Sequence, residues 1–242
     1  MKICWACERE LPEDSYSAEQ RGRRQSIRRC EECVAAGNQL VLMKKGSERS
    51  EADDCPLCQL PLPLDLEQTS FRVCCMKLVC KGCILGARKR GMNDCPFCRA
   101  PAPNENQILA MIQKRVDAGD PIAIWNLGNH YADGSHGLQK DVTRAVVLYE
   151  HAAELGLKEA HFELGHLYEK GECVEKDTYK AIQHFEAAAV KGDAYARNSL
   201  GVLEDDDGNY DLALQHYMIA AKMGNQVALD NVKAWFVHGL AT

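Results

Sequence analysis

The chain has 242 residues, of which 46% are apolar and 26% are charged. This composition is typical of a folded globular protein and excludes a largely disordered chain. The first residues, MKICWACERE, contain no apolar run of signal-peptide length, and no later segment approaches the roughly 18 to 20 apolar residues that cross a bilayer. We therefore expect an intracellular protein, cytoplasmic or nuclear, that does not enter a membrane.

Charge is divided unevenly along the chain. Residues 1–100 carry 17 Lys and Arg against 14 Asp and Glu, a net charge of +3, whereas residues 101–242 carry 12 against 21, a net charge of −9. Because an acidic half does not follow a phosphate backbone, binding of nucleic acid by the whole chain is not expected, and only the first half could do it. The sequence also has no Gly-rich phosphate loop and no nucleophile motif, which argues against a small-molecule enzyme.

Cysteine usage predicts metal sites in the first hundred residues. Reducing compartments keep thiols free, so the 13 cysteines of an intracellular chain favour thiolate metal ligands over disulfides. Twelve of them lie before residue 99, and all eight histidines lie at or after His130. Any metal in the first hundred residues must therefore be held by cysteine alone.

The first predicted segment, residues 1–50, contains two CxxC pairs separated by 22 residues, Cys4 with Cys7 and Cys30 with Cys33. Two such pairs suit one tetrahedral zinc ion, because each pair forms a tight turn that donates two sulfurs. A segment this short has little apolar core, so we expect metal ligation to supply much of its folding free energy.

Five arginines lie between these pairs, within residues 21–29. They could contact a phosphate or an acidic partner, or they could form a solvated positive face, which we favour. The polar stretch GSERSEADD at residues 46–54 has no hydrophobic periodicity and is predicted to be a linker.

The second segment, residues 51–103, contains four further cysteine pairs over 44 residues, enough ligands for two zinc ions. Its sequence CPLC...CCMKLVCKGC...CPFCR resembles the RING finger family in its all-cysteine form. That resemblance implies a cross-brace in which the first and third pairs hold one zinc and the second and fourth pairs hold the other. The first set would be Cys55, Cys58, Cys80 and Cys83, and the second Cys74, Cys75, Cys95 and Cys98.

The adjacent cysteines Cys74 and Cys75 depart from the commoner RING pattern. When Cys75 is aligned with the cysteine that precedes the usual histidine ligand, Lys77 occupies the histidine position. A protonated lysine is a poor zinc ligand, so the all-cysteine register, with Cys74 third and Cys75 fourth, fits better. Neighbouring side chains point to opposite faces of a flat strand, so this register requires a turn or bulge at residues 74–75.

The RING resemblance also implies a function in ubiquitin transfer. RING fingers bind a ubiquitin-conjugating enzyme and hold its thioester-linked ubiquitin in a reactive pose, which is catalysis by positioning. Leu57 and Pro96 match docking positions, and Arg99 matches the linchpin arginine that bridges enzyme and ubiquitin. Ala87 stands where a large apolar residue is frequent, and Ile84 or Leu85 would compensate. Alternatively, Leu57 and Pro96 shape the metal turns and Arg99 is solvated.

The third segment, residues 104–242, is a repeat array. Gly119, Gly156, Gly192 and Gly224 recur at intervals of 37, 36 and 32 residues, and Leu-Gly and Ala-Ala pairs recur with them. Apolar residues at three- and four-residue intervals predict two amphipathic helices per unit. We divide the array into a capping helix at 104–119, repeats at 120–156, 157–192 and 193–224, and a partial unit at 225–242.

Particular residues of each unit have expected roles. Asp141, Asp177 and Asn209 are predicted to cap the second helix, and the glycines that recur at its end, Gly156, Gly192 and Gly224, to terminate it. Gly128 and Gly165 would allow close helix approach. The histidines do not recur at equivalent positions and are expected to be ordinary helix residues.

The segments LGNHYADG...KDVTRAVVLYEHAAELG and LGHLYEKGECVEKDTYKAIQHFEAAAVKG resemble Sel-one-like repeats, helix pairs related to tetratricopeptide repeats. The third copy departs from them in a shorter loop. The two resemblances and the first pair of CxxC motifs together imply a mainly α protein, a C-terminal α-solenoid preceded by small α+β zinc modules, with three zinc ions in all. It would be a ubiquitin ligase whose repeats recruit a substrate or adaptor protein, or a non-enzymatic scaffold, or, less favoured, a nucleic-acid contact by residues 1–50. The oligomeric state is not encoded.

Overall fold

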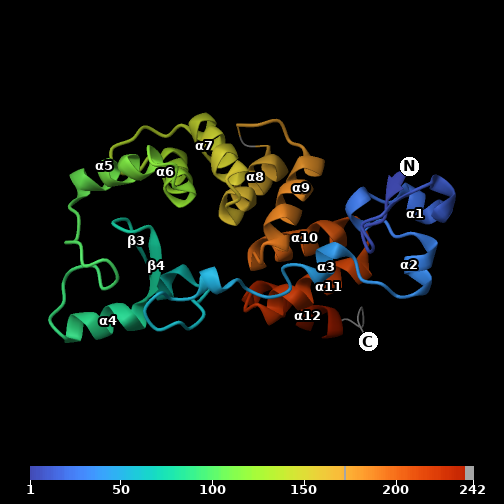
Figure 1. The fold of residues 1–242 in the computed structure, drawn as a ribbon, viewed down its shortest axis with the longest axis horizontal. Helices are drawn as coiled ribbons and strands as arrows, with labels where there is room; N and C mark the ends of the chain where they lie inside the picture. Colours follow the sequence, from blue (N-terminus) through green and yellow to red (C-terminus); the bar gives the residue numbers. More distant parts are fainter. Residues whose placement is uncertain (172, 238–242) are drawn as a thin grey trace. The chain divides into compact units, whose positions relative to one another are not determined.

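A computed structural model describes residues 1–171 and 173–237, and it is mainly helical, as predicted (Figure 1). The strands and helices, in chain order, are β1 Lys2–Ile3, β2 Glu10–Leu11, α1 Ala18–Gly22, α2 Glu31–Ala35, α3 Val41–Lys44, β3 Thr69–Arg72, β4 Lys77–Cys80, α4 Lys81–Lys89, α5 Glu105–Val116, α6 Pro121–Asp133, α7 Val142–Glu154, α8 Lys158–Lys170, α9 Thr178–Val190, α10 Ala194–Asp206, α11 Tyr210–Lys222 and α12 Gln226–Val237. None of the helices in these described ranges has the length and apolar character needed to cross a membrane.

The chain folds as two compact units. Unit 1 consists of residues 1–49 together with the chain from Ala189 onward, and unit 2 consists of Ser50–Ala188. The first cysteine segment is thus grouped with the third helix pair, and the second cysteine segment with the capping helix and the first two pairs. The predicted domains 1–50, 51–103 and 104–242 do not coincide with these units, because each unit combines one cysteine segment with part of the repeat array. The three-domain division therefore stays a prediction.

Glycine allows the two helices of each pair to pack closely. An added Cβ would lie 2.6 Å from a ring carbon of Tyr149 at Gly128, 2.5 Å from Phe185 at Gly165, and 2.6 Å from Tyr217 at Gly201. Real Cβ atoms do not approach neighbours this closely, so only glycine admits the aromatic ring of the second helix. The prediction that Gly128 and Gly165 permit close approach is confirmed, and Gly201 repeats it.

Most of the predicted helix ends are also confirmed. The side chains of Asp141 and Asp177 each accept a hydrogen bond, 2.9 Å long, from the backbone N–H three residues on. The terminating glycines Gly156, Gly192 and Gly224 have φ values of 90°, 83° and 99°, which side chains disfavour. The predicted cap at Asn209 is wrong. Its side chain makes no capping bond; its Nδ2 instead donates to the carboxylate of Glu204 at 2.9 Å, which orients the amide toward Glu204.

Replacing Gly165 by alanine is expected to destabilise the α8–α9 pair by about 1–3 kcal/mol, because the new methyl group overpacks against Phe185. Hydrogen exchange of α8 and α9 in increasing urea measures the change. Gly86→Ala in α4 is the matched control, since nothing lies within 4 Å of its added Cβ and alanine favours a helix. Equal effects of the two substitutions would contradict the packing argument.

Both ends of the array differ from the repeats. At the near end, Asn104 and Gln107 form a capping box that starts α5, with both hydrogen bonds 3.1 Å long. At the far end, α12 has Lys233 at the position that Gly128 and Gly165 hold in complete pairs, so it has no place for a second helix's ring. The predicted partial unit extends to 242, and its last five residues lie outside the described ranges.

Candidate metal centres

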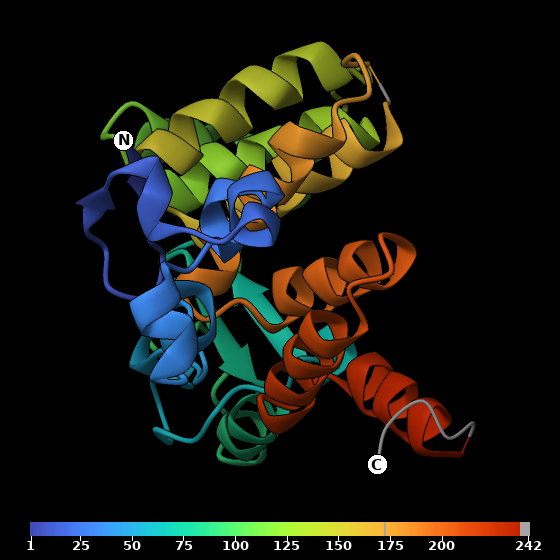
Figure 2. The same cartoon turned by 90° about the vertical axis from the view of Figure 1, so that its right-hand side faces the viewer.

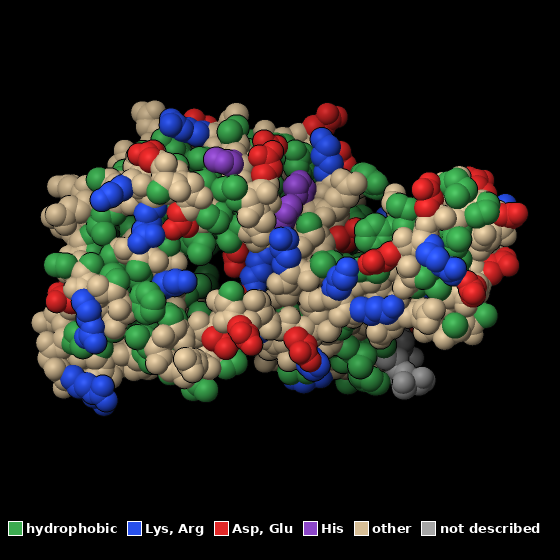
Figure 3. All heavy atoms as spheres, viewed as in Figure 1, with side chains coloured by type: hydrophobic (Ala, Val, Ile, Leu, Met, Phe, Trp, Pro, Cys, Tyr) green, Lys and Arg blue, Asp and Glu red, His purple; other side chains and the backbone are tan. Residues whose placement is uncertain are grey.

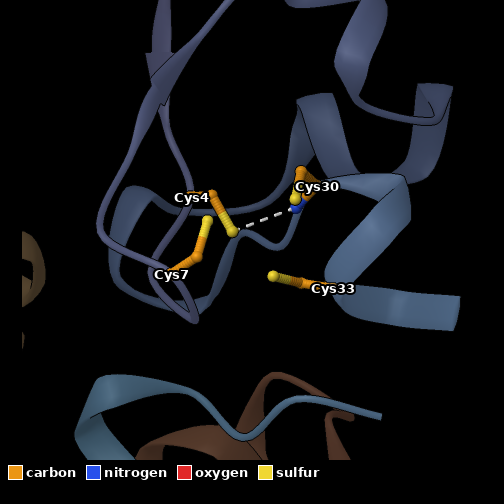
Figure 4. A group of neighbouring side chains, drawn as sticks. All are labelled: Cys4, Cys7, Cys30 and Cys33. Atoms are coloured by element: carbon orange, nitrogen blue, oxygen red, sulfur yellow. Dashed lines mark hydrogen bonds between the residues drawn. The ribbon is translucent and has the colours of Figure 1, made fainter. Parts of the chain in front are cut away.

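The first group of four cysteines joins the β1–β2 hairpin to α2. Cys4 and Cys7 lie on the turn after β1, and Cys30 and Cys33 lie at the start of α2. Their four sulfurs point toward one another (Figure 4) and lie within 4.8 Å of each other. The backbone N–H of Cys30 donates to the sulfur of Cys4 at 3.2 Å. The cluster thus offers four sulfur ligands and no other ligand type.

The other two groups are interleaved along the chain. Cys55 and Cys58 meet Cys80 and Cys83, and the adjacent pair at 74–75 meets the pair at 95 and 98; within each group all sulfurs lie within 4.8 Å. These are the two sets that the RING resemblance implied. Cross-pair sulfur distances of 4.0, 3.9, 3.9 and 3.3 Å bracket the roughly 3.7 Å expected for two sulfurs about 2.3 Å from one tetrahedral zinc.

The adjacent cysteines lie in a turn, as their proposed pairing requires. Strands β3 and β4 form an antiparallel hairpin, the teal arrows of Figure 2, in which Thr69 pairs with Cys80 and Arg72 with Lys77. Residues 73–76 form the turn between them, and Met76 has a φ of 51°. The turn lets Cys74 and Cys75 face the same group, which a flat strand would prevent.

Three copies of one backbone turn present half of these sulfurs. After Cys7, Cys58 and Cys98 the next residue, respectively Glu8, Gln59 and Arg99, has a φ between 56° and 64°. In each copy that residue's N–H donates to the carbonyl of the first cysteine, at 2.7, 2.8 and 2.9 Å. The remaining CxxC pairs, at 30/33 and 80/83, are presented differently, because each lies at the N-terminus of a helix, α2 or α4.

The electrostatics of the groups favour a bound cation. Burial by itself raises thiol pKa values, but backbone N–H groups directed at the sulfur outweigh it at Cys4, Cys55 and Cys95 and lower the pKa to about 6. Burial, followed by the charge of Cys95, raises the pKa of Cys75 to about 11. Four thiolates at this spacing repel one another, and a dication relieves that repulsion.

The three groups therefore fit structural zinc. Sulfur is a preferred ligand of this ion, and four sulfurs fill its tetrahedral coordination without leaving a position for water. Bound zinc would supply a cross-link between chain segments rather than an activated water. The residues that could hold the three ions are Cys4, Cys7, Cys30 and Cys33, then Cys55, Cys58, Cys80 and Cys83, then Cys74, Cys75, Cys95 and Cys98.

The turn that carries Cys74 and Cys75 is anchored on the repeats within unit 2. Met76 is buried and packs with Ile112 of α5 and with Ala123 and Leu127 of α6. The guanidinium of Arg115 donates to the carbonyl of Cys74 at 3.1 Å. This finger is therefore continuous with the packing of the capping helix and the first repeat.

A second anchor lies in the segment predicted to be a linker. Asp53 accepts the ammonium of Lys158 on both carboxylate oxygens at 2.6 Å, and this ion pair is largely buried. The backbone N–H of Asp53 also donates to Ser50, whose own N–H donates back to the Asp53 carboxylate. The boundary between the two units, after Arg49, lies within the predicted linker 46–54, and this ion pair fixes Asp53, near the end of that stretch, within unit 2.

The predicted docking residues are not all exposed. Leu57 and Leu85 are 39% and 55% exposed, and Arg99 is also exposed. Pro96 is buried, and Ile84 is buried against Cys55, so Ile84 cannot compensate for Ala87 at the surface. The reason is the phase of α4, which turns Ile84 toward the finger's core and Leu85 outward.

Sequence reasoning missed Phe97, which is 41% exposed. It occupies the same place in CPFC that Leu57 occupies in CPLC, one residue before the second cysteine of the pair. Because the two turns share one geometry, the repeated spacing was a signal that both side chains point outward.

Three of the arginines of residues 21–29 have hydrogen-bond or ion-pair partners within unit 1. Arg24 pairs with the buried carboxylate of Glu204, and Arg28 donates to the carbonyls of Gln20 and Arg23 at 3.2 and 2.7 Å. Arg29 donates to the carbonyl of Asn38 at 3.2 Å. The prediction of a solvated positive face is therefore wrong for these three, because backbone and carboxylate oxygens take their donors.

Consecutive helix pairs that follow small cysteine-containing modules in the sequence define a repeat scaffold for protein–protein contacts. The Sel1 repeat family matches residues 121–157, 158–193 and 194–225, so the chain carries three Sel1 repeats. A solved Sel1 repeat protein from Oxalobacter formigenes is 26% identical, with a TM-score of 0.54, over 64% of this chain and 62% of that one.

Two curated relatives share part of the chain. The ERAD-associated E3 ubiquitin-protein ligase component HRD3B of Arabidopsis thaliana is 32% identical over 100 residues, 41% of this chain and 15% of that protein. The DAP3-binding cell death enhancer 1 of Rattus norvegicus is 35% identical over 97 residues, 38% of this chain and 19% of that protein. The matched part thus spans less than a fifth of either relative.

Proposed function

We propose that the chain is a zinc-binding RING-type ubiquitin ligase, in which residues 51–103 dock a ubiquitin-conjugating enzyme and the Sel1 repeats recruit a substrate or adaptor protein. The observation that carries the proposal is the pair of interleaved cysteine groups beside the exposed side chains of Leu57, Leu85 and Phe97. The name of the similar Arabidopsis protein, a component of a ubiquitin ligase, points the same way.

The chemistry of the finger suits docking rather than bond making. Its cysteine groups leave no open metal position, so its residues would act by binding and orienting. The exposed apolar side chains would supply contact area, and the five guanidinium donors of Arg99 would bridge carbonyls of two proteins. On the face drawn in Figure 3, basic side chains lie among apolar ones over α4, β3 and β4, and Lys81, Arg88, Lys89 and Arg90 of this region are exposed.

A purified reaction with a panel of conjugating enzymes tests the proposal. Leu57→Ala and Arg99→Ala are expected to slow ubiquitin chain formation at least tenfold, about 1.4 kcal/mol each, as residues central to an interface do. Leu66→Ala is the matched control, since Leu66 is an exposed leucine of the same segment outside the cysteine turns. No chains with any conjugating enzyme, or full activity in both variants while zinc stays bound, would overturn it.

The second candidate is a non-enzymatic scaffold, and two observations favour it. Ala87 leaves the docking surface without a large side chain at its position, and burial of Ile84 and Pro96 reduces the apolar area further. A scaffold would capture its partners equally well with Leu57→Ala and Arg99→Ala. Nucleic-acid binding by residues 1–50 has lost its main support, since Arg24, Arg28 and Arg29 have partners within the unit.

A further inference from the structure

A short segment that follows the first cysteine group lies on the third repeat, within unit 1. This segment, residues 40–46, is called the tail segment below and includes α3. Its side chains Leu40 and Met43 are buried in one cluster with Ile27 and with Leu212 of α11. The cluster is separate from the core around the cysteines, which consists of Cys4, Ala6, Tyr16, Cys30 and Cys33. The tail segment also contacts the N-terminal module, through Ile27 and a 2.6 Å hydrogen bond from the Val41 N–H to the Trp5 carbonyl, so the repeat supplies one side of its receptor surface.

Arg197 of α10 fixes the backbone of the tail segment. Its side chain is fully buried, and its guanidinium donates to the carbonyl of Leu42 and, at 2.7 Å, to that of Lys45. These carbonyls lie at the end of α3, where no further turn of helix donates N–H groups to them. The same guanidinium also donates to the carbonyl of Ala189 at 3.1 Å. A buried arginine with only carbonyl partners acts here as a clamp on a helix end.

A buried ion pair holds the N-terminal module on the same repeat. Arg24 pairs with Glu204 of α10, whose side chain is 1% exposed, and Asn209 donates to the other carboxylate oxygen. Close by, Gly46 passes so near the backbone of Ala189 that a Cβ there would lie 1.8 Å from its carbonyl oxygen. The contact between residues 1–49 and the third repeat thus combines an apolar cluster, a buried ion pair and a close backbone approach at Gly46.

The other two repeats lack the residues that make this receptor. Arg197 stands where the first two repeats have Ile124 and His161, and Glu204 stands where both have tyrosine. In those repeats a cation of the second helix lies over the tyrosine ring, Arg144 over Tyr131 at 4.4 Å and Lys180 over Tyr168 at 5.0 Å. In the third repeat the cation position is Leu212, which instead packs against the tail segment. Three equivalent positions have changed together.

We propose that the third Sel1 repeat is a peptide-docking surface that the chain's own tail segment occupies and thereby closes. The surface fits a short aliphatic helix whose last carbonyls accept from Arg197 and whose apolar side chains contact Leu212 and Ile219. A partner with this chemistry binds only when the tail segment leaves. The proposal is independent of ubiquitin transfer. While the tail segment is docked, other proteins would bind to other surfaces of the chain.

Peptide binding to the full-length chain tests this autoinhibition. The probe is a fluorescently labelled peptide with the sequence of residues 38–47, NQLVLMKKGS, and the variant is Met43→Asp, which places a charge in the apolar cluster and leaves the receptor unchanged. An intramolecular segment competes at an effective concentration of the order of 1 mM. We expect the variant to bind the probe at least about tenfold more tightly than the wild-type chain. Met218→Asp, at an exposed position of the same helix α11, is expected to behave as wild type.

A second substitution tests the receptor itself. Arg197→Ala added to Met43→Asp is expected to remove the gain, because the clamp on the probe's carbonyls is lost. Hydrogen exchange of α10 and α11 shows whether each variant keeps the repeat folded. If Met43→Asp unfolds the repeat, the double substitution Leu40→Ala with Met43→Ala is a milder way to release the tail segment. Three results would each overturn the proposal. The wild-type chain and Met43→Asp could bind the probe equally tightly, Met43→Asp could stay folded and not bind it, or Arg197→Ala could leave the binding unchanged.

Discussion

Serine in place of Cys75 is expected to release one zinc ion and to unfold the turn between β3 and β4. A hydroxyl does not replace a thiolate as a zinc ligand, and structural zinc contributes about 10–16 kcal/mol to the folding of small domains at neutral pH. The loss should extend past the turn, because Met76, the next residue, is buried among Ile112, Ala123 and Leu127. Hydrogen exchange of residues 69–80 and of α5 measures both effects.

Cys173→Ser is the matched control for that substitution. Cys173 is exposed, and it lies outside the three cysteine groups found among the described residues. The Cys173→Ser substitution should change neither the zinc content nor the hydrogen-exchange rates of residues 69–80 and α5. If Cys75→Ser resembled Cys173→Ser, the assignment of the adjacent cysteines to one ion would be wrong.

Methionine in place of Arg24 is expected to destabilise unit 1 by about 3–5 kcal/mol. The substitution keeps the apolar stem but leaves the carboxylate of Glu204 buried without its cation, which costs more than the pair itself contributes. Urea unfolding followed through hydrogen exchange of α10 and α11 measures the loss. The docked tail segment should open at the same urea concentration, because the ion pair and Arg197 hold the same repeat.

A double substitution separates the ion pair from simple packing. Glu204→Met added to Arg24→Met removes the stranded charge, so most of the lost stability should return. Arg23→Met is the matched control, since its ion pair with Glu19 is exposed and pairs of that kind contribute about 0–1 kcal/mol. A loss below about 1 kcal/mol for Arg24→Met, or no recovery in the double variant, would contradict a structural role for the buried pair.

The repeats could be predicted from the sequence because each signal in them is local. Gly128 and Gly165 recur with the aromatic residue that packs on them, and the glycines that end each pair recur with their positive φ. The cysteine groups were accessible for a related reason: each CxxC pair brings two sulfurs close together, on a turn or at a helix N-terminus, and the RING resemblance supplied the interleaving of the pairs. These features require no knowledge of distant contacts.

The remaining features depend on contacts between distant segments. Arg24 and Glu204 are 180 residues apart, and each looks like an ordinary surface residue in its local sequence. The signal that existed was the departure of the third repeat from the other two, and its changed positions Arg197 and Leu212 contact residues 40–46. The cap assigned to Asn209 failed for the same reason, since the hydrogen bond to the buried Glu204 orients its amide toward that carboxylate.

The zinc content of the intact chain tests the account most directly, because three cysteine groups organise its first hundred residues. Native mass spectrometry of the wild-type protein should show three zinc ions per chain, and the same measurement on Cys75→Ser should show two. Fewer than three ions in the folded wild-type chain, or three retained by Cys75→Ser, would contradict it.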